Sequence, residues 1–173
     1  VLDGVSLEGF YRAVNKVSPS FIRTEADEVT YSLHVIARFE LEAALIGGGL
    51  AVADLPAAWN DTMASLLGIR PKNDAEGCLQ DIHWSMGLIG YFPSYALGNL
   101  YGAQFWDAMK AQGLDPEAAT EAGDLAAILA WLRENVHKPG AMYKPGELIQ
   151  RVTGSELDAS HFVRYLNQKY AGV

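Results

Sequence analysis

Signals that begin and end helices recur along the whole sequence, whereas alternation of apolar and polar residues with β-branched enrichment is almost absent. One helix is expected to follow Thr24 as N-cap, with Asp27 in its first turn, and to stop at the glycines 47–49. A second is expected to open at Asp54 and to close at Gly68. The pattern predicts an all-α protein.

The later helices are marked in the same way. Asn73 is expected to cap a helix that carries the segment GCLQDIHW (residues 77–84), and another helix should run from Ser94 to near Gly113 with an aromatic, buried face. Three shorter helices should begin near Asp124, Pro145 and Asp158. No repeat, low-complexity tract or linker divides the sequence, which predicts a single helical domain over residues 1–173.

Charge and apolar patterning exclude several classes of partner. The net charge of -8, with 13 Lys and Arg against 21 Asp and Glu, disfavours nucleic acid, because phosphate contacts need clustered basic side chains. Arg38, Glu40 and Glu42 interrupt the most apolar stretch, so a membrane span is not expected. A single cysteine, Cys78, excludes an internal disulfide and fits a reducing compartment, so we expect a cytoplasmic protein.

The sequence starts at Val1 without an initiator Met and without the basic and apolar regions of a signal peptide. We therefore expect this chain to be a fragment that continues upstream.

The segment 77–84 concentrates polar function. On a helix with ~100° per residue, Gln80 and His83 would share one face and Asp81 would point about a quarter-turn away. Such a helix could direct the imidazole into a cleft. Taken alone, the segment favours the simpler alternative that His83, next to apolar residues, is a hydrogen-bonded core residue. These apolar neighbours are Leu79, Ile82 and Met86.

A second candidate is Arg23, just before the expected helix. A guanidinium fork beside the backbone N–H groups of a helix N-terminus can bind a carboxylate. The alternative is a structural ion pair with Asp27 or with an acid distant in sequence. The residues themselves leave the two interpretations even.

Other catalytic constellations are weak. None of the four histidines begins a His-Glu-x-x-His zinc motif, and no Gly-x-Ser-x-Gly turn is present. The pairs Glu134 with His137 and Asp158 with His161 have a spacing seen in di-metal bundles, but they lie at helix ends, where charge compensation explains them more simply. Cys78 is expected to face the core. The sequence thus predicts no metal site.

The segments IRTEAD (residues 22–27) and GCLQDIHW resemble two motifs of the carboxypeptidase Taq family of zinc metallocarboxypeptidases. The resemblance extends over nearly the whole chain, through NDAEGCLQDIHWSMGLIGYFPSYALGNLYGAQFW and WLRENVHKPGAMYKPGELIQRVTG. It implies the C-terminal portion of a larger all-helical metallopeptidase fold. The family's His-Glu-x-x-His helix and its third zinc-ligating Glu have no counterpart here.

The resemblance also implies roles for individual residues. Arg23 would recognise the free α-carboxylate of a peptide substrate. His83, with Tyr91 or Tyr95, would donate hydrogen bonds to the oxyanion of the tetrahedral intermediate. The groups expected to orient these side chains are Asp27, Gln80 and Asp81.

Two hypotheses follow. The first is that the chain is the C-terminal part of a zinc-dependent carboxypeptidase, which supplies the substrate-side wall of the cleft. Zinc would be bound in the intact family enzyme and not by this chain alone, which should be inactive. Its partners would be peptide C-termini, the missing N-terminal portion and further copies of itself in a homo-oligomer. The second hypothesis is a stand-alone helical binding or interaction module.

Overall fold

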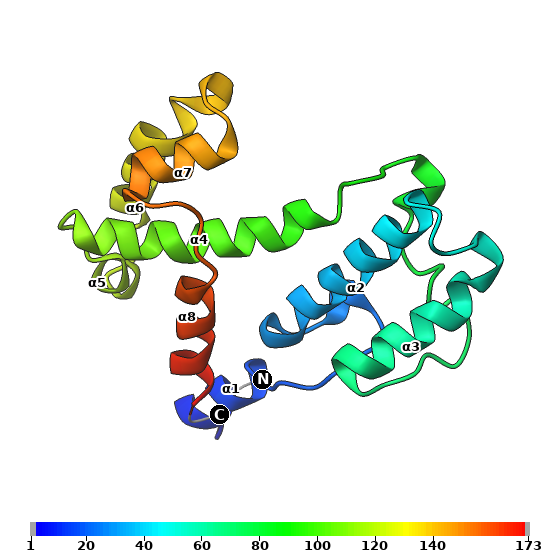
Figure 1. The fold of residues 1–173 in the computed structure, drawn as a ribbon. Coiled ribbons are helices and arrows are strands. Elements are labelled where there is room, and N and C mark those ends of the chain that lie inside the picture. The colour runs from blue at the N-terminus through cyan, green and yellow to red at the C-terminus, as the bar shows by residue number, and fades with distance from the viewer. Residues whose placement is uncertain (1–2, 172–173) are drawn as a thin grey trace. The chain divides into compact units, whose positions relative to one another are not determined.

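A computed structural model describes residues 3–171, and Figure 1 shows this part of the chain as helices joined by turns and loops, without a strand. This confirms the all-α prediction. The α-helices are α1 (Leu7–Val14), α2 (Glu28–Ile46), α3 (Leu55–Leu67), α4 (Pro93–Ala111), α5 (Pro116–Glu121), α6 (Leu125–Leu132), α7 (Pro145–Thr153) and α8 (Ser160–Tyr170). Short 3-10 helices are η1 (Arg23–Glu25), η2 (Val52–Asp54), η3 (Trp84–Met86) and η5 (Gly140–Met142), and η4 (Arg133–His137) is a π-helical turn.

The chain forms two compact units, Val1–Ala96 with Tyr170–Val173 and Leu97–Lys169, with the division inside α4. We call them the first and second units. The prediction of one domain over residues 1–173 stays a prediction. Within residues 3–171, no helix is both long and apolar enough to cross a membrane.

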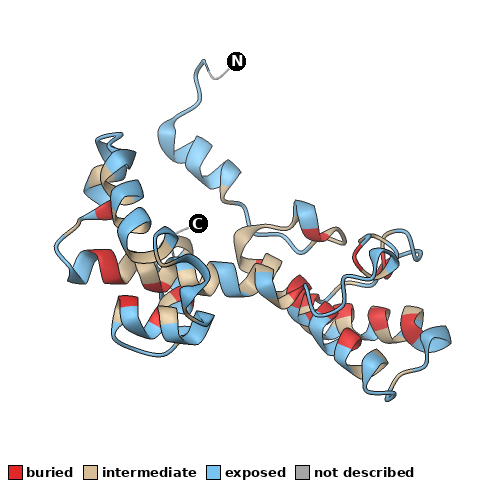
Figure 2. Ribbon diagram, turned by 90° about the horizontal axis from the view of Figure 1, so that it is seen from above, coloured by how far each residue is buried: buried red, intermediate tan, exposed pale blue. Residues whose placement is uncertain are grey.

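The core of the first unit lies between α2 and α3. Trp59, Met63 and Leu67 recur at every fourth position of α3, so they form one buried stripe, as the sequence predicts. They pack against Ala37 and Leu41 of α2. Cys78 belongs to the same cluster, as expected of a core-facing cysteine. In contrast, α1 has no buried residue and is exposed along its length (Figure 2).

The start of α2 differs from the prediction. Its N-cap is Asp27 and not Thr24, because the Asp27 carboxylate accepts hydrogen bonds from the backbone N–H groups of Val29 and Thr30. Thr24 lies in η1 instead. The predicted stop is correct, since Gly47 forms the C-cap.

The helix predicted after Asn73 is wrong. Turns and bends occupy residues 73–83, followed by the short η3. Asn73 accepts from the Glu76 N–H, as an N-cap would. The Gln80 side chain, however, donates to the carbonyl oxygens of Glu76 and Gly77, and the first of these would accept the Gln80 backbone N–H in a continuing helix. The segment therefore forms a compact loop on which the helical-face argument for His83 does not hold.

The second unit includes most of α4 and is centred on a polar side chain. Gln104 is 1% exposed, and its amide nitrogen donates to Thr153 Oγ1, Ser155 Oγ and the Glu156 carbonyl oxygen. On the stripe of α4 that was expected to be aromatic and buried, Met109 is buried, but Tyr101 and Phe105 are half-buried and Leu97 is 38% exposed. The helices expected near Asp124, Pro145 and Asp158 are α6, α7 and α8, whereas α1 and α5 were not predicted.

Candidate functional site

Asp81 lies at the centre of a buried ion cluster with Arg23 and Arg38. Asp81 Oδ1 accepts hydrogen bonds from Arg23 Nη2 at 2.8 Å and Arg23 Nε at 3.2 Å. Asp81 Oδ2 accepts from Arg38 Nε at 2.5 Å. The side chains of Arg23, Arg38 and Asp81 are 8%, 0% and 12% exposed. Of the two structural partners considered for Arg23, the distant acid is therefore the one found.

Two guanidiniums face one carboxylate in this ion cluster, which leaves an excess of one positive charge. Burial alone would raise the pKa of Asp81, but hydrogen bonds from Arg23 and the charge of Arg38 outweigh it, so this pKa lies below its usual range. For the fully buried Arg38, burial prevails over attraction to Asp81 and lowers the pKa. A site with a net positive charge, shielded from water, favours an anion.

Arg23 is held from the side. Its Nε and Nη2 face Asp81, while Nη1 donates to the Tyr31 hydroxyl at 3.1 Å, and the guanidinium lies 4.9 Å from the Tyr95 ring centroid. A guanidinium carries five N–H donors, and these bonds leave one on Nη1 and one on Nη2. One N–H on each of Nη1 and Nη2 thus has no acceptor among the described residues and can serve a second carboxylate.

His83 is buried at 7% exposure among aromatic rings, with Phe92 at 4.4 Å and Tyr91 at 5.8 Å between ring centroids. Its Nε2 shares a hydrogen bond of 2.9 Å with the Tyr95 hydroxyl, and its Nδ1 lies 3.8 Å from Asp81 Oδ1. The structure thus brings His83 to the same carboxylate that holds Arg23. Tyr91 is 46% exposed.

The apolar neighbours expected around His83 do not bury it. Leu79, Ile82 and Met86 are 72%, 69% and 68% exposed. Residues 73–83 do not form a helix, so helical spacing does not place these side chains beside the imidazole.

Gln80 joins the two motifs through the backbone. Its Oε1 accepts from the Arg23 backbone N–H at 2.9 Å, and its Nε2 donates to the Phe21 carbonyl oxygen at 2.9 Å. Asp27 caps α2 through Oδ1, and its Oδ2 accepts a hydrogen bond from the Ser18 backbone N–H. Gln80 and Asp27 thus fix the backbone on either side of Arg23, whereas Asp81 fixes its side chain.

Three side chains of α2 that contact the site residues are not predicted from the sequence. Arg38 and Glu42 enter the sequence analysis only as charges that interrupt an apolar stretch, and Tyr31 does not enter it. Glu42 is 5% exposed and accepts from the Trp84 indole N–H and the Gly90 backbone N–H. A signal was available: Arg38 and Glu42 are four residues apart, so on a helix they share a face, and Glu40 lies off that face.

The candidate metal pairs have other partners. Asp158 accepts from the Ser160 N–H and hydroxyl, and His161 bonds to Asp107, which also pairs with Arg164. Glu134 pairs with Lys138 one helical turn away. In residues 3–171, no group of three or more His, Cys, Asp or Glu side chains is arranged to hold a metal ion.

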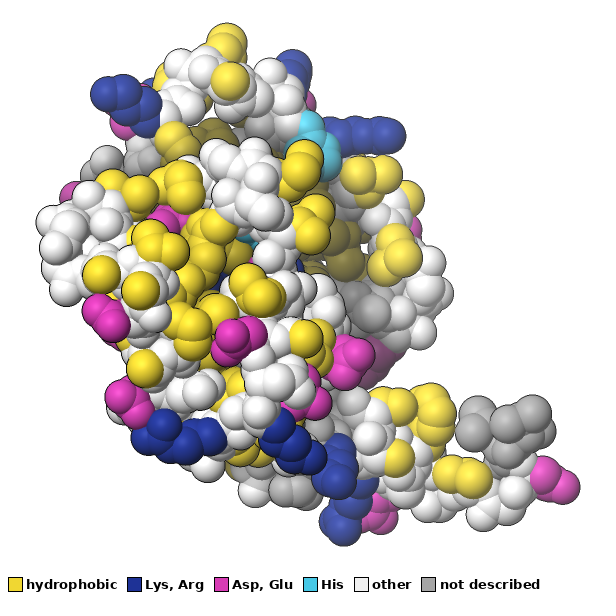
Figure 3. All heavy atoms as spheres, turned by 90° about the vertical axis from the view of Figure 1, so that its right-hand side faces the viewer, with side chains coloured by type: hydrophobic (Ala, Val, Ile, Leu, Met, Phe, Trp, Pro, Cys, Tyr) yellow, Lys and Arg dark blue, Asp and Glu magenta, His cyan; other side chains and the backbone are white. Residues whose placement is uncertain are grey.

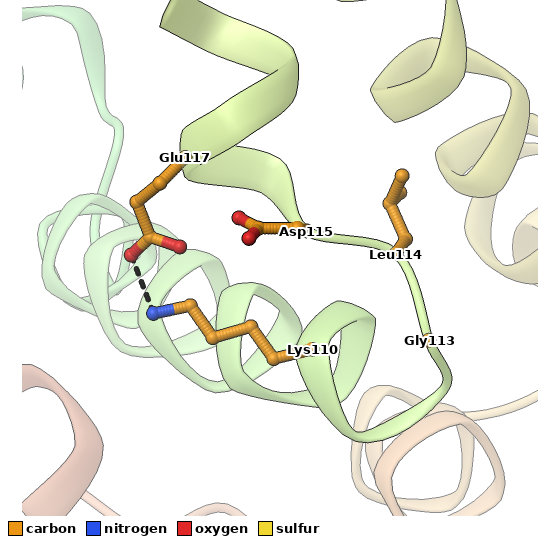
Figure 4. Close-up of a pocket in the computed structure, with 5 residues that line it drawn as sticks. All are labelled: Lys110, Gly113, Leu114, Asp115 and Glu117. Carbon is orange, nitrogen blue, oxygen red and sulfur yellow. Dashed lines mark ion pairs between the residues drawn. The ribbon is translucent and has the colours of Figure 1, made fainter.

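A pocket of ≈ 370 Å³ lies at the turn from α4 to α5, where Lys110 pairs with Glu117 (Figure 4). Gly113, Leu114 and Asp115 complete its lining. The pocket contains none of the residues of the ion cluster.

The comparisons with known proteins agree on one family. The model of the Carboxypeptidase Taq (M32) metallopeptidase family matches residues 1–170. Thermostable carboxypeptidase 1 of Thermus thermophilus is 48% identical over 174 residues, which cover 99% of this chain and 34% of that protein. Carboxypeptidase 1 of Bacillus subtilis is 46% identical over 169 residues, with 98% and 34% covered. The crystal structure of an M32 carboxypeptidase from Deinococcus radiodurans R1 superposes with a TM-score of 0.93 at 48% identity, over 98% of this chain and 34% of that one.

The all-helical fold and the family match agree on the class of protein, a family of metallopeptidases. This chain belongs to the carboxypeptidase Taq (M32) family, and it spans about a third of the length of the relatives it matches.

Proposed function

We propose that this chain is the C-terminal part of a zinc-dependent carboxypeptidase that removes C-terminal amino acids from peptides, and that it forms the substrate-side wall of the cleft. Membership of the family and the coverage of about a third of each relative support this assignment. The observation that carries it is the unbalanced ion cluster, in which Asp81 holds Arg23 from the side and leaves the end of its fork free.

Arg23 binds the terminal α-carboxylate of the peptide. A carboxylate at the end of the fork balances the excess positive charge of the ion cluster, and two parallel N–H bonds orient it. Tyr31 adds to this subsite, because its hydroxyl already accepts from Arg23 Nη1 and still has a proton to donate. An amidated C-terminus offers no negative charge, so this subsite selects for a free terminus.

His83 and Tyr95 act as a coupled donor pair. Their hydrogen bond of 2.9 Å places the two groups in one unit, and the role proposed here uses the imidazole tautomer with its proton on Nε2. His83 then donates to the tyrosine oxygen, and the Tyr95 O–H remains available for the oxyanion of the tetrahedral intermediate. The more exposed Tyr91 packs against both rings and forms part of the wall.

Because no group of three or more His, Cys, Asp or Glu side chains in the described residues is arranged to hold a metal ion, the proposal assigns no step of the reaction to metal held by this chain. In this proposal, the zinc ligands and the general base belong to the other two thirds of the family's catalytic domain. The isolated chain should accordingly hydrolyse no peptide.

A chimera tests the proposal. The third of Bacillus subtilis carboxypeptidase 1 that matches this chain is replaced by residues 1–173, and zinc content and release of C-terminal amino acids are measured for the chimera and for the chain alone. We expect stoichiometric zinc and turnover from the chimera and neither from the chain. A folded, zinc-loaded chimera without turnover would favour the binding-module alternative, and turnover by the chain alone would overturn the assignment.

A further inference from the structure

Glu42 connects two points of the loop that carries the site's aromatic side chains. Its Oε2 accepts a hydrogen bond from the Trp84 indole N–H at 2.7 Å, and its Oε1 accepts from the Gly90 backbone N–H at 2.6 Å. Both distances are typical of charge-assisted bonds. A carboxylate that is 5% exposed needs such partners, and here each oxygen has one.

The chain between these two points has little other attachment. Residues 85–90 are all exposed, and Leu88 and Ile89 are among the exposed large hydrophobic side chains. Gly87 and Gly90 have φ of 72° and 78°, in a region that side chains rarely adopt, so the loop turns sharply twice. Its own hydrogen bonds, such as Leu88 N–H to the His83 carbonyl, stay within residues 82–88. Hydrophobic side chains also gather on the face of the molecule shown in Figure 3.

The two attachment points adjoin His83, a member of the proposed donor pair, and Tyr91, which packs against it. His83 precedes Trp84, and Tyr91 follows Gly90. The His83 and Tyr91 rings lie 5.8 Å apart, and the Trp84 ring is packed edge-on against Trp59 and Phe92. A shift at either end of residues 84–90 would therefore move a ring that lines the site.

We infer that Glu42 is a positioning residue: by holding both ends of the loop 84–90 against α2, it fixes the placement of His83 and Tyr91. The catalytic part of this inference rests on the proposed function, whereas the holding of the loop does not. No bond is made or broken by Glu42, which acts only through the loop.

Glu42→Gln is the test variant, because it keeps the size of the side chain but replaces one acceptor oxygen with an NH2 group. One of the two N–H donors then faces another donor, and one end of the loop is released. Glu40→Gln is the matched control: it makes the same change of charge two residues away on α2, at an exposed position. Trp84→Phe removes the indole donor, together with part of the ring that packs against Trp59 and Phe92, and serves as a second variant should Glu42→Gln fail to fold.

Limited proteolysis of the 173-residue chain measures the holding of the loop without any activity. Chymotrypsin should cut at Leu88 or Tyr91 about tenfold faster or more in Glu42→Gln and in Trp84→Phe than in the unchanged chain, since a lost bond to a charged acceptor raises the population of the open loop by that order. Glu40→Gln should be cut at the original rate. Equal rates in Glu42→Gln and Glu40→Gln, with helical content retained, would overturn the inference.

Kinetics in the chimera test the positioning role. Glu42→Gln should lower kcat about tenfold or more while KM changes less than about twofold, because the residues that hydrogen-bond to Arg23, namely Gln80, Asp81 and Tyr31, lie outside the loop. Glu42→Asp, with a shorter but still charged side chain, should recover part of the rate. Faster proteolysis with unchanged kcat would overturn the positioning role, and an inactive parent chimera would count against the proposed function while the proteolysis result stands.

Discussion

Arg38 Nε donates a hydrogen bond of 2.5 Å to Asp81 Oδ2, and this buried ion pair joins α2 to the loop that follows α3. Arg38 is completely buried, and its Nη2 has no hydrogen-bond partner among the described residues. Burying a guanidinium costs free energy that the pair must offset. The ion pair with Arg38 fixes the position of the Asp81 carboxylate, and the same carboxylate orients Arg23.

Loss of Arg38 should therefore destabilise the fold. Arg38→Gln leaves Asp81 with one cationic partner and is expected to lower the free energy of unfolding by about 3 kcal/mol or more, as is typical of a broken buried pair. Urea titration followed by circular dichroism measures it. Arg70→Gln, which breaks the exposed pair of Arg70 with Asp61, should cost no more than about 1 kcal/mol. Similar losses for the two variants would contradict the buried role of Arg38.

Stability should fall as pH decreases from about 6.5 to 4, because of His34. This imidazole is fully buried and has no hydrogen-bond partner among residues 3–171, and burial with the nearby charges of Arg38 and Arg23 lowers its pKa from 6.5 to about 4. Between these values the unfolded chain binds a proton that the folded chain does not, so acid favours unfolding, by about 3 kcal/mol over the window.

His34→Leu should flatten this pH dependence, measured as the urea midpoint at several pH values. His137→Gln, a change at an exposed imidazole, should leave it as it is. An unchanged slope in His34→Leu would show that other groups cause the acid sensitivity. The lowered pKa of Asp81 adds a separate loss below about pH 4, where the carboxylate takes up a proton.

Cys78 should react slowly in the native protein. Burial, with the charge of Asp74, raises the pKa of its thiol, so little thiolate is present at neutral pH and access is poor. Dithiobis(nitrobenzoate) should label the Cys78 thiol at least about tenfold more slowly in buffer than in 8 M urea. Equal labelling rates would mean that the core cluster around Trp59 opens readily.

Tyr95→Phe and Tyr91→Phe should lower kcat to different extents in the active chimera. Loss of the hydroxyl that bonds to His83 is expected to lower kcat about 100-fold with little change in KM, as for the loss of one oxyanion donor. Tyr91→Phe should have a much smaller effect, since Tyr91 meets His83 only through its ring. The reverse order would reassign the donor to Tyr91.

The sequence predicts the fold best where the periodicity of apolar residues determines which side chains are buried. The α3 stripe of Trp59, Met63 and Leu67 and the stop at Gly47 follow from local rules. The two motifs predict which residues form the site. They do not predict how these residues are arranged, because hydrogen bonds between residues distant in sequence determine the arrangement. Asp81 meets Arg38 and Gln80 meets Arg23 only through tertiary structure. The Gln80 side chain also takes carbonyl groups that the predicted helix would have used.

If the free end of the Arg23 fork binds a terminal carboxylate, a ratio of two kcat/KM values must depend on Arg23. In the active chimera, kcat/KM is measured for one peptide with a free C-terminus and for its C-terminal amide, with and without Arg23→Ala. We expect the variant to lose about 10- to 100-fold on the free peptide, mainly through KM, and to lose little on the amide, so that the preference for a free terminus collapses. A folded Arg23→Ala chimera that keeps the original preference would show that Arg23 does not bind the terminal carboxylate.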